Sequence, residues 1–516
     1  MSNKITSDNL AKSITFVFLT SGFRWLLGCM RIVIVAFLFG ATFAYDAYLV
    51  AFTIPEMISG LLVGVIAVTF IPIFTEHLCK DGEAKAWNFV SSLINLIFLF
   101  GILLMIVMVG IAPFLLRIVA PGFDQKTFQL AAHLLMVMIP FILIISLAEL
   151  FTLILNTYQR FTVPALIRIV EVATSVLCLI YLSKKYGIFS LAIGLLLGAI
   201  ARLVLQVPIL WKKFRYYHFG LNLNLPGIKK INLLLGPMVF CMLFFRVGMV
   251  IERILASNLK EGSISILGYA NTLASVPSEI FLNSLGVVLF PLISKYAVEN
   301  KLIDFKATFS KGIRIGNFIL VPIAILFIFF GKPIISALLE RGRFTSLMTQ
   351  DMSIALAIYA LGLLAMATFF FSAHACYALQ EVKITIKIAI LVTILNIIMK
   401  LILINYLSFA GLALATSVAL IVQSGLLLRF VIKKIGSIHE KIIALSALKT
   451  LAASILMTGT CWLLFGSLVL DSHSPLYLPA LIGTAGLSYL VFSYLLRSEE
   501  LTTIKEIFRK MLTSIA

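Results

Sequence analysis

Apolar runs of about 20 residues recur along the whole chain and are separated by short polar segments. A run of this length lets an α-helix cross the hydrocarbon core of a membrane, which is about 30 Å thick. Fourteen such helices are predicted, starting near residues 14, 46, 87, 128, 161, 187, 232, 264, 310, 351, 384, 410, 442 and 475. The predicted fold is therefore an all-α, polytopic membrane protein.

Lysine and arginine residues concentrate in alternate loops between these helices, which indicates how the chain is oriented. Loops rich in these residues stay on the cytoplasmic side, so both termini are predicted to be cytoplasmic. The formal net charge of +19 is explained by this topology and not by nucleic-acid binding, because the cations lie in short segments between apolar runs. The strongest cytoplasmic anchors are Lys212, Lys213, Arg215, Lys229, Lys230, Lys433 and Lys434.

The composition excludes a water-soluble globule. Hydrophobic residues make up 61% of the chain and charged residues 12%, and the mean hydropathy is +1.10. The first apolar run is too long for a signal peptide, so we expect the first helix to be retained. The six cysteines are scattered without a CxxC pair, and no catalytic or nucleotide-binding motif occurs. We therefore predict neither an enzyme nor a bound metal or cofactor.

Two arginine pairs point to an internal repeat. Arg24 and Arg31 lie seven residues apart in the first predicted helix, and Arg246 and Arg253 repeat this spacing 222 residues later. Seven residues return to within about 20° of the same helical face, so each pair forms one cationic stripe. Other positions repeat at offsets of 219 to 222 residues: Pro55 with Pro277, Pro72 with Pro291, Gly122 with Gly342, and Gln159 with Gln380.

This offset spans six predicted helices, and an even number keeps the second copy in the same orientation as the first. The sequence thus predicts a parallel repeat around an axis along the membrane normal. The predicted organisation is an N-lobe of helices 1 to 6 (1–218), a C-lobe of helices 7 to 12 (219–436), and helices 13 and 14 with a cytoplasmic tail (437–516). Transport folds of this kind bind substrate between the repeats and expose it alternately to the two sides.

Charged residues inside predicted membrane helices form the candidate site. A cation there costs about 2.5–3.5 kcal/mol even on a lenient insertion scale, so the four arginines indicate a polar cavity for an anionic substrate. Guanidinium groups donate paired hydrogen bonds to oxyanions, which favours a phosphate or pyrophosphate clamp made by Arg24, Arg31, Arg246 and Arg253. The alternative is a set of structural ion pairs. The acids available for pairing are Glu56, Glu252 and Glu279.

Other polar and helix-bending residues complete the candidate site. Asp46, at the outer start of the second predicted helix, is predicted to act as a gate or as a helix cap. Prolines inside helices 2 and 8 remove backbone hydrogen bonds and bend the helix, which suits lobes that rock. Static kinks that only fit the packing are the alternative for these residues. The prolines are Pro55, Pro72, Pro277 and Pro291.

Longer segments of the chain resemble the MurJ/MviN lipid II flippases of the multidrug/oligosaccharidyl-lipid/polysaccharide exporter superfamily. The resemblance runs through nearly the whole length. It is carried by "FGATFAYDAYLVAFTIPE", "FIPIFTEH", "APGF", "IPFILIISLAELFTLILNTYQRFTVPA" and "GYANTLASVPSEIFLNSLGVVLFPLISK". It implies two lobes around a V-shaped cavity lined by helices 1, 2, 7 and 8, with a groove at helices 13 and 14 for a lipid tail. It also implies that undecaprenyl-pyrophosphate-linked peptidoglycan precursor crosses the bacterial inner membrane by alternating access.

The arginines that line the cavity in this family carry over only in part. The later arginine of helix 1 falls on Arg31, whereas the earlier one falls on Trp25, next to Arg24. The family's arginine pair in helix 2 falls on Ser59 and Gly60. The glutamate after that pair falls on Gly64, and the Asp-Arg of helix 8 on Asn271 and Thr272; helix 7 instead carries Arg246, Glu252 and Arg253.

The leading hypothesis is a lipid II flippase. The nearest alternative is a flippase for another polyprenyl-linked oligosaccharide of O-antigen, capsule or teichoic type, because the family's arginines are rearranged. An exporter of small organic cations is disfavoured by the cationic cavity, and a non-transporting membrane scaffold is the remaining alternative. Expected partners are the polyprenyl-pyrophosphate-linked glycan, membrane lipid and cell-wall synthesis proteins, without nucleic acid; whether an ion couples transport is left open.

Overall fold

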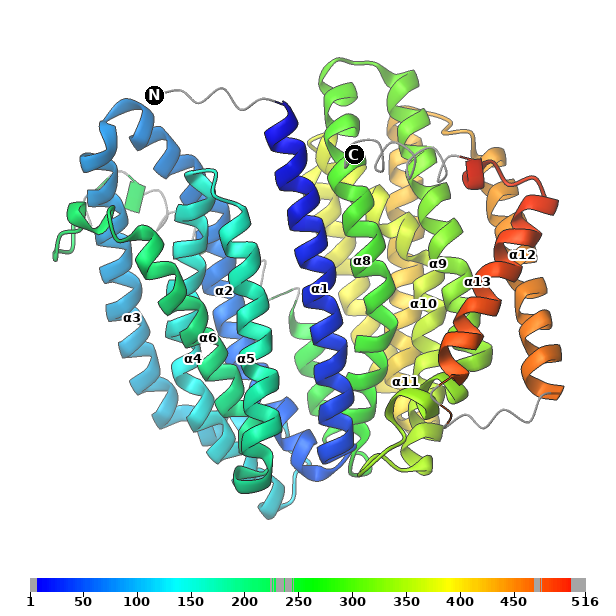
Figure 1. Cartoon of the computed structure of the whole chain (residues 1–516), viewed down its shortest axis with the longest axis horizontal. Helices are drawn as coiled ribbons and strands as arrows, with labels where there is room; N and C mark the ends of the chain where they lie inside the picture. Colours follow the sequence, from blue (N-terminus) through cyan, green and yellow to red (C-terminus); the bar gives the residue numbers. More distant parts are fainter. Residues whose placement is uncertain are drawn as a thin grey trace. The chain divides into compact units, whose positions relative to one another are not determined.

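The protein is all-helical in the computed structural model, which describes residues 7–222, 225, 227–228, 236, 244, 246–467, 474 and 476–502 (Figure 1). Its long helices are α1 (Ser7–Phe39), α2 (Phe43–Lys80), α3 (Gly82–Val119), α4 (Gln125–Thr157), α5 (Thr162–Tyr186), α6 (Phe189–Leu210), α8 (Ser263–Val298), α9 (Leu302–Leu339), α10 (Ser346–Ala378), α11 (Val382–Ile435), α12 (Glu440–Ser467) and α13 (Tyr477–Leu495). A short 3-10 helix, η1 (Phe214–Tyr216), follows α6.

Within the described part of the chain, 12 helices are long and apolar enough to cross a membrane. Helix α11 contains two of the predicted helices, because Ser408 in its middle leaves helical geometry with a φ of 53°. The predicted helix that starts near residue 232 lies partly outside the described residues, although 246–256 are helical. The prediction of an all-α membrane protein of about 14 helices is confirmed.

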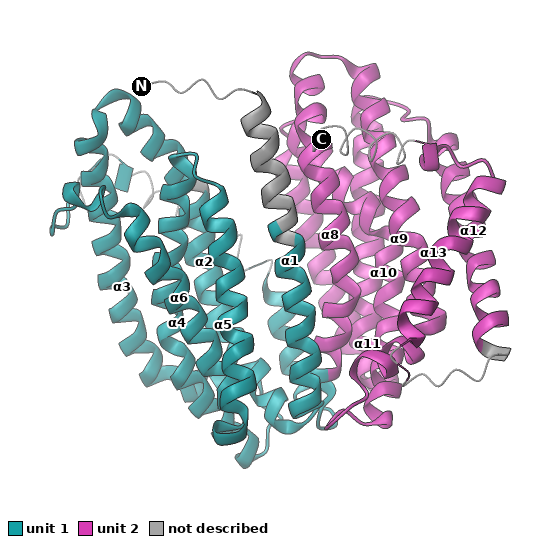
Figure 2. Cartoon of the chain, in the orientation of Figure 1, with its two compact units in different colours: residues 1–265 teal, residues 266–516 magenta. Residues whose placement is uncertain are grey.

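The chain divides into two compact units, residues 1–265 and residues 266–516 (Figure 2). Unit 1 holds α1 to α6, η1 and residues 246–265. Unit 2 holds the remainder of α8 and α9 to α13. The predicted lobes, with boundaries after residues 218 and 436, stay a prediction.

Helix α4 is the central helix of unit 1. It packs against α2, α3 and α6, while α5 packs against α6 and α1. One end of this unit is tied by polar contacts around the fully buried Trp87, whose indole N–H donates to the Tyr158 hydroxyl at 3.0 Å. Tyr158 donates to the Glu83 carboxylate at 2.8 Å, and Lys213 pairs with the same carboxylate. These contacts join the turn after α6 to the start of α3 and the end of α4.

Unit 2 is built around α9, which packs against α10 and α12; α10 packs against α11, and α12 against α13. The Tyr489 hydroxyl of α13 donates to the Phe318 carbonyl of α9 at 2.7 Å. Just after α13, Glu499 and Glu500 pair with Arg314 of α9 at 2.7 and 2.6 Å. The segment after the last helix is thereby anchored on α9.

The outward side chains of α3 are mostly large and apolar. Phe98, Leu103, Ile106 and Phe114 each expose about half of their surface or more, at 50, 57, 67 and 66%. A water-soluble protein rarely leaves such a continuous apolar surface uncovered. This surface matches the hydrocarbon core of a bilayer.

Candidate functional site

Asp46 lies in the first turn of α2 and is 4% exposed. Its carboxylate does not cap its own helix. It accepts hydrogen bonds from the backbone N–H groups of Gly262 and Ser265, both at 2.7 Å, and from the Ser265 hydroxyl. The first N–H groups of a helix have no partner within that helix, so the carboxylate of α2 satisfies those at the start of α8.

The reverse contact is present as well. The Glu261 carboxylate, just before α8, accepts from the backbone N–H of Phe43, the first residue of α2, at 2.9 Å. Each helix start therefore receives an acid from the other segment. We call the contacts of Asp46 and Glu261 with Phe43, Gly262 and Ser265 the α2–α8 latch; all five residues belong to unit 1.

Close backbone packing supports this latch. Gly262 has a φ of +86°, and a Cβ atom there would lie 2.4 Å from the Ala41 carbonyl oxygen. A third segment joins through Gly122, between α3 and α4, whose N–H donates to the Ser257 hydroxyl at 3.2 Å. The start of α2, the start of α8 and the connection between α3 and α4 are all predicted to lie on the outer side of the membrane.

Arg253 contributes to the same cluster. Its guanidinium donates to the Ile264 carbonyl at 3.3 Å and interacts electrostatically with Asp46. Its Nε is buried and has no hydrogen-bond partner among the described residues. The structure thus places Arg253 beside the latch.

Arg246 lies against α2. Its guanidinium is 3.7 Å from the Glu56 carboxylate, with both side chains about two-fifths exposed. A Cβ atom at Gly60 would lie 2.8 Å from the Arg246 Nη2 atom, so the missing side chain makes room for this guanidinium. Gly60 is where the family resemblance expects an arginine of helix 2. A cation supplied by the segment before α8 occupies that place in this chain.

Arg31 is half-buried on α1. Its charge lies near the Tyr48 hydroxyl of α2, and so does the charge of Glu56. Within the described residues no hydrogen bond or ion pair of Arg31 is found. Arg31 and Arg246 therefore border the same part of α2, and Arg31 is the arginine of this group that keeps its donors available.

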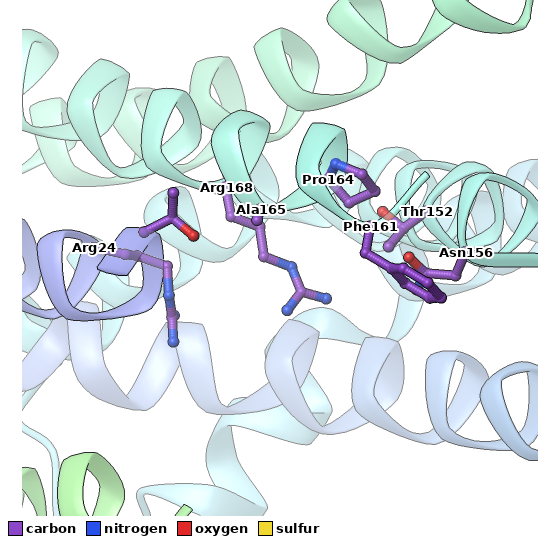
Figure 3. Close-up of a pocket in the computed structure, with 8 residues that line it drawn as sticks. Arg24, Thr152, Asn156, Phe161, Pro164, Ala165 and Arg168 are labelled. Atoms are coloured by element: carbon purple, nitrogen blue, oxygen red, sulfur yellow. The ribbon is translucent and has the colours of Figure 1, made fainter. Parts of the chain in front are cut away.

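Arg24 lies elsewhere, in a cavity of about 210 Å³ between α1, α4 and α5 (Figure 3). Arg168 of α5 lines the same cavity. The predicted grouping of Arg24 with the other three arginines stays a prediction. The other lining residues are Thr20, Thr152, Asn156, Phe161, Pro164 and Ala165.

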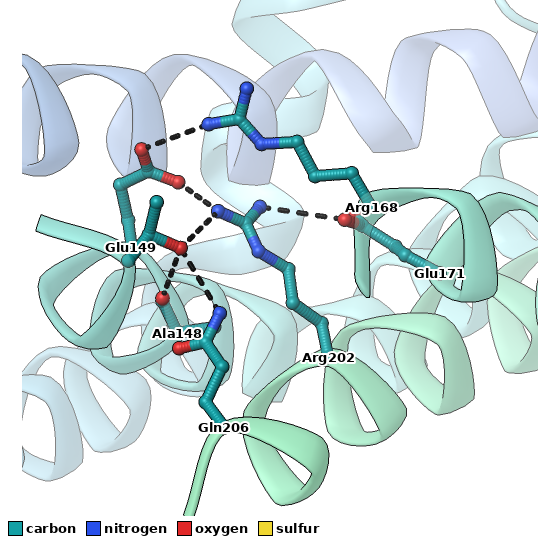
Figure 4. Close-up of polar contacts among 7 residues, drawn as sticks. Ala148, Glu149, Arg168, Glu171, Arg202 and Gln206 are labelled. Carbon is teal, nitrogen blue, oxygen red and sulfur yellow. Dashed lines mark hydrogen bonds and ion pairs between the residues drawn. The ribbon is translucent and has the colours of Figure 1, made fainter. Parts of the chain in front are cut away.

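Beside this cavity, α4, α5 and α6 share a network of charged residues that sequence reasoning missed (Figure 4). Arg202 of α6 is 6% exposed and pairs with Glu149 of α4 and, at 3.4 Å, with Glu171 of α5. Glu149 also pairs with Arg168 at 3.3 Å. The Thr152 hydroxyl oxygen accepts from Arg202 at 3.1 Å and from Gln206 at 3.0 Å.

A signal for this network exists in the sequence. Glu149 and Thr152 are three residues apart on α4, and Arg202 and Gln206 four apart on α6, so each pair lies on one helical face. Ionisable residues inside membrane helices are rare and are candidates for function by default. These charged residues have no charged counterparts at the offset of 222, so the internal repeat does not reveal them.

The remaining predicted residues lie where the sequence placed them along the helices. Glu252 and Glu279 are half-buried, and Glu279 belongs to unit 2. Pro55 and Pro72 lie inside α2, and Pro277 and Pro291 inside α8. Their roles as counter-ions and as helix bends stay predictions. No group of three or more metal-binding side chains occurs in the described residues.

The helical fold defines the class: a polytopic membrane protein whose fold is that of transporters of the MOP superfamily. A solved structure titled as the inward-facing conformation of a multidrug resistance MATE family transporter of that superfamily superposes with a TM-score of 0.70 at 15% identity, and covers 81% of this chain and 96% of its own. This likeness shows the fold alone. The family model of lipid II flippase MurJ matches residues 35–482, so the chain belongs to the lipid II flippase MurJ family.

Individual relatives agree with this assignment. A probable lipid II flippase MurJ of Buchnera aphidicola subsp. Acyrthosiphon pisum is 30% identical over 415 residues, which cover 80% of this chain and 81% of that relative. A solved structure titled "Lipid II flippase MurJ, inward closed conformation" has a TM-score of 0.80 and 26% identity, and covers 93% of this chain and 98% of its own.

Proposed function

We propose that this protein is a flippase that moves lipid II across the bacterial cytoplasmic membrane by alternating access. The observation that carries the proposal is the match of the MurJ family model over residues 35–482. A transporter of this kind is not an enzyme, because its substrate leaves chemically unchanged. Both termini are cytoplasmic in this proposal, since the basic loops then lie on the cytoplasmic side.

The pyrophosphate of the substrate is held in part by Arg31 and Arg246 in this proposal. Arg31 keeps its guanidinium donors available, and donors of this shape suit oxyanions. The Arg246–Glu56 pair is long at 3.7 Å and partly exposed, and such pairs contribute only about 0–1 kcal/mol. A pyrophosphate therefore replaces the Glu56 carboxylate at little cost.

The α2–α8 latch acts as the gate on the outer side in this proposal. Hydrogen bonds to a charged group each contribute about 1.5–3 kcal/mol. The bonds to Asp46 therefore stabilise the state in which the outer gate is closed by several kcal/mol at most, relative to the open state. A substrate that binds the open state more tightly than the closed state can overcome a free-energy difference of this size. Opening requires the N–H groups at the start of α8 to exchange Asp46 for water.

The flippase also needs binding partners and a source of energy. The substrate and the surrounding membrane lipid are the partners that the family assignment implies, and contacts with cell-wall synthesis proteins are a further expectation. The membrane potential acts on a moving charge with about 2.3 kcal/mol per elementary charge per 100 mV.

The test is to deplete the protein in its native host and measure lipid II with a probe confined to the outer face of the cytoplasmic membrane. We expect accessible lipid II to fall while total lipid II holds or rises. Complementation with the wild type or with Arg343→Gln, an exposed control outside the site, should restore it, whereas Arg31→Gln should not. Unchanged accessible lipid II, with no other flippase present, would assign the protein to another polyprenyl-linked glycan.

A further inference from the structure

The chain that follows α6, residues 211–222, is fastened to the side of α3; we call it the post-α6 segment. The Asn95 amide of α3 donates to the Gly220 carbonyl at 2.9 Å and to the His218 carbonyl at 3.3 Å. The His218 N–H donates to the Ser91 hydroxyl, one turn earlier on α3, at 3.1 Å. Figure 1 shows this segment, in green, at the edge of unit 1 next to α3. Its position along α3 is therefore fixed.

These contacts lie at the boundary of the lipid-facing part of α3. The large apolar side chains that α3 exposes begin at Phe98 and end at Ile118. This stretch is about 30 Å long, which equals the thickness of the hydrocarbon core of a bilayer. Before Phe98, the exposed residues of α3 are Gly82, Ala84, Lys85 and Asn88. Asn95 precedes Phe98 by about 4.5 Å along the helix, so the post-α6 segment meets α3 at the level of the lipid head groups.

Two aromatic residues of the post-α6 segment are exposed at this end of unit 1. Phe219 is 94% exposed, although it lies between the two residues whose carbonyls accept from Asn95. Its backbone is thus held in place while its side chain contacts almost nothing in the chain. Trp211, the residue after α6, is 70% exposed. Aromatic side chains of this kind are typical of the boundary between a membrane and water.

Basic side chains accompany the aromatic ones. The post-α6 segment holds Lys212, Lys213 and Arg215 and no acid. Lys213 is directed at Glu83 of α3, with which it pairs, and Glu83 also lies near the charge of Arg215. Lys212 is exposed and makes no ion pair with any residue that the structure describes. Three cations thus stand against one acid, which leaves an excess of positive charge beside the exposed aromatic residues.

We propose that the post-α6 segment binds anionic phospholipids of the leaflet on the side of the α2–α3 turn. Phe219 and Trp211 insert among the head groups, and Lys212 and Arg215 pair with lipid phosphates. Anionic lipids attract cations at a membrane surface, and burial of aromatic side chains adds to the attraction. In the proposed orientation this leaflet is cytoplasmic. The inference concerns the surrounding lipid, so it does not depend on which glycan the protein transports.

A lipid surface explains the position of Phe219 better than a protein partner does. The apolar surface of α3 that starts at Phe98 matches the hydrocarbon core, and Phe219 lies beside the start of that surface. The same bilayer therefore covers both. Lipid bound there holds the end of α6, and with it the start of the connection between the two copies of the sequence repeat, at the membrane surface.

The test is photo-cross-linking of the full-length protein with p-benzoylphenylalanine in place of Phe219. The protein is placed in nanodiscs with equal amounts of phosphatidylglycerol and phosphatidylcholine, and mass spectrometry identifies the adducts. We expect lipid adducts at this position, as at Phe98, and none at Asn88, which lies about 15 Å further from the hydrocarbon core along α3. Phosphatidylglycerol should be cross-linked about fivefold more than phosphatidylcholine, the effect of one basic residue near an anionic surface.

The basic side chains are tested in the same photoreactive protein. Lys212→Gln combined with Arg215→Gln should remove the preference for phosphatidylglycerol while lipid adducts persist. Lys85→Gln is the matched control, because Lys85 is an exposed lysine about 20 Å before Phe98 on α3. Charges beyond the screening length of about 8 Å at physiological salt have little effect, so this variant should keep the preference.

Two results would overturn the proposal. The first is a lack of lipid adducts at position 219 while the same probe in place of Phe98 yields them. The second is lipid adducts at position 219 without any head-group preference in the protein that keeps Lys212 and Arg215. Cross-linking in cells addresses a protein partner, and adducts of position 219 with another protein in place of lipid would also contradict the proposal. The replaced side chains are exposed, so the variants should fold like the wild type.

Discussion

Asp46 and Ser265, which are 219 residues apart, are joined by two hydrogen bonds to a single carboxylate oxygen, one from the backbone N–H and one from the hydroxyl of Ser265. The second oxygen of the same carboxylate accepts from Gly262. One buried acid thereby fixes the start of α8 to the start of α2. Asp46 belongs to the first copy of the sequence repeat and Ser265 to the second, and both lie in unit 1.

Replacing Asp46 with Asn should weaken this latch. The amide keeps one acceptor oxygen but turns an NH2 group toward the Gly262 N–H, so the bond at 2.7 Å is lost. We expect the free energy of unfolding to fall by about 1.5–3 kcal/mol, the contribution of a hydrogen bond to a charged group, and lipid II transport to fall. Thermal unfolding and the lipid II accessibility assay measure the two effects.

Asp124→Asn is the matched control for the latch. Asp124 caps its own helix, α4, by accepting from the Thr127 N–H, and hydrogen bonding from Thr127 holds the pKa of the Asp124 carboxyl below its usual value. The same chemical change at this exposed helix cap should cost less stability than Asp46→Asn and leave transport intact. Equal loss of transport in both variants would contradict a gating role for Asp46.

Gly262→Ala should disturb the same latch through the backbone. The residue has a φ of +86°, and its new Cβ atom would lie 2.4 Å from the Ala41 carbonyl oxygen. We expect a loss of about 1–3 kcal/mol of stability together with loss of transport. Gly436→Ala is the control, since its φ of +81° is similar but its Cβ would meet only the flexible end of Lys306 at 3.4 Å. A control variant as damaging as Gly262→Ala would assign the effect to backbone conformation alone.

Arg202→Leu should be the most destabilising single change in the network of Figure 4. Removing a buried cation leaves Glu171 without its partner and Glu149 with Arg168 alone, and breaking a buried pair costs about 3–5 kcal/mol. Lys434→Gln, which breaks the exposed Lys434–Glu381 pair, should cost about 0–1 kcal/mol. Thermal unfolding in detergent compares the two, and similar losses would show that the network contributes little to stability.

The helices were predictable because each needs an apolar run long enough to span the membrane, and such runs are visible in the sequence. Even α11 follows this rule, since its break at Ser408 separates the two predicted helices. Side-chain partners were less predictable. Arg24 and Arg31 share a face of α1, but a seven-residue step also moves about 10 Å along the axis, so each meets different neighbours. The sequence predicts a local helix cap or a gate at Asp46, and only the tertiary structure shows that this carboxylate accepts from the start of a helix 219 residues away.

Arg246 and Glu56 pair at 3.7 Å, and this geometry is compatible with two roles for the arginine, substrate binding and structural pairing. If Arg246 holds substrate, Arg246→Gln should abolish transport with a stability loss of no more than about 1 kcal/mol, because the pair is partly exposed. Glu56→Gln should then retain transport, since the guanidinium loses only a competitor for the pyrophosphate. If the pair is structural, both variants should lose stability to a similar extent, and combining them should add little to either alone. Transport and thermal unfolding of the two single variants and the double variant therefore separate substrate binding from structural pairing.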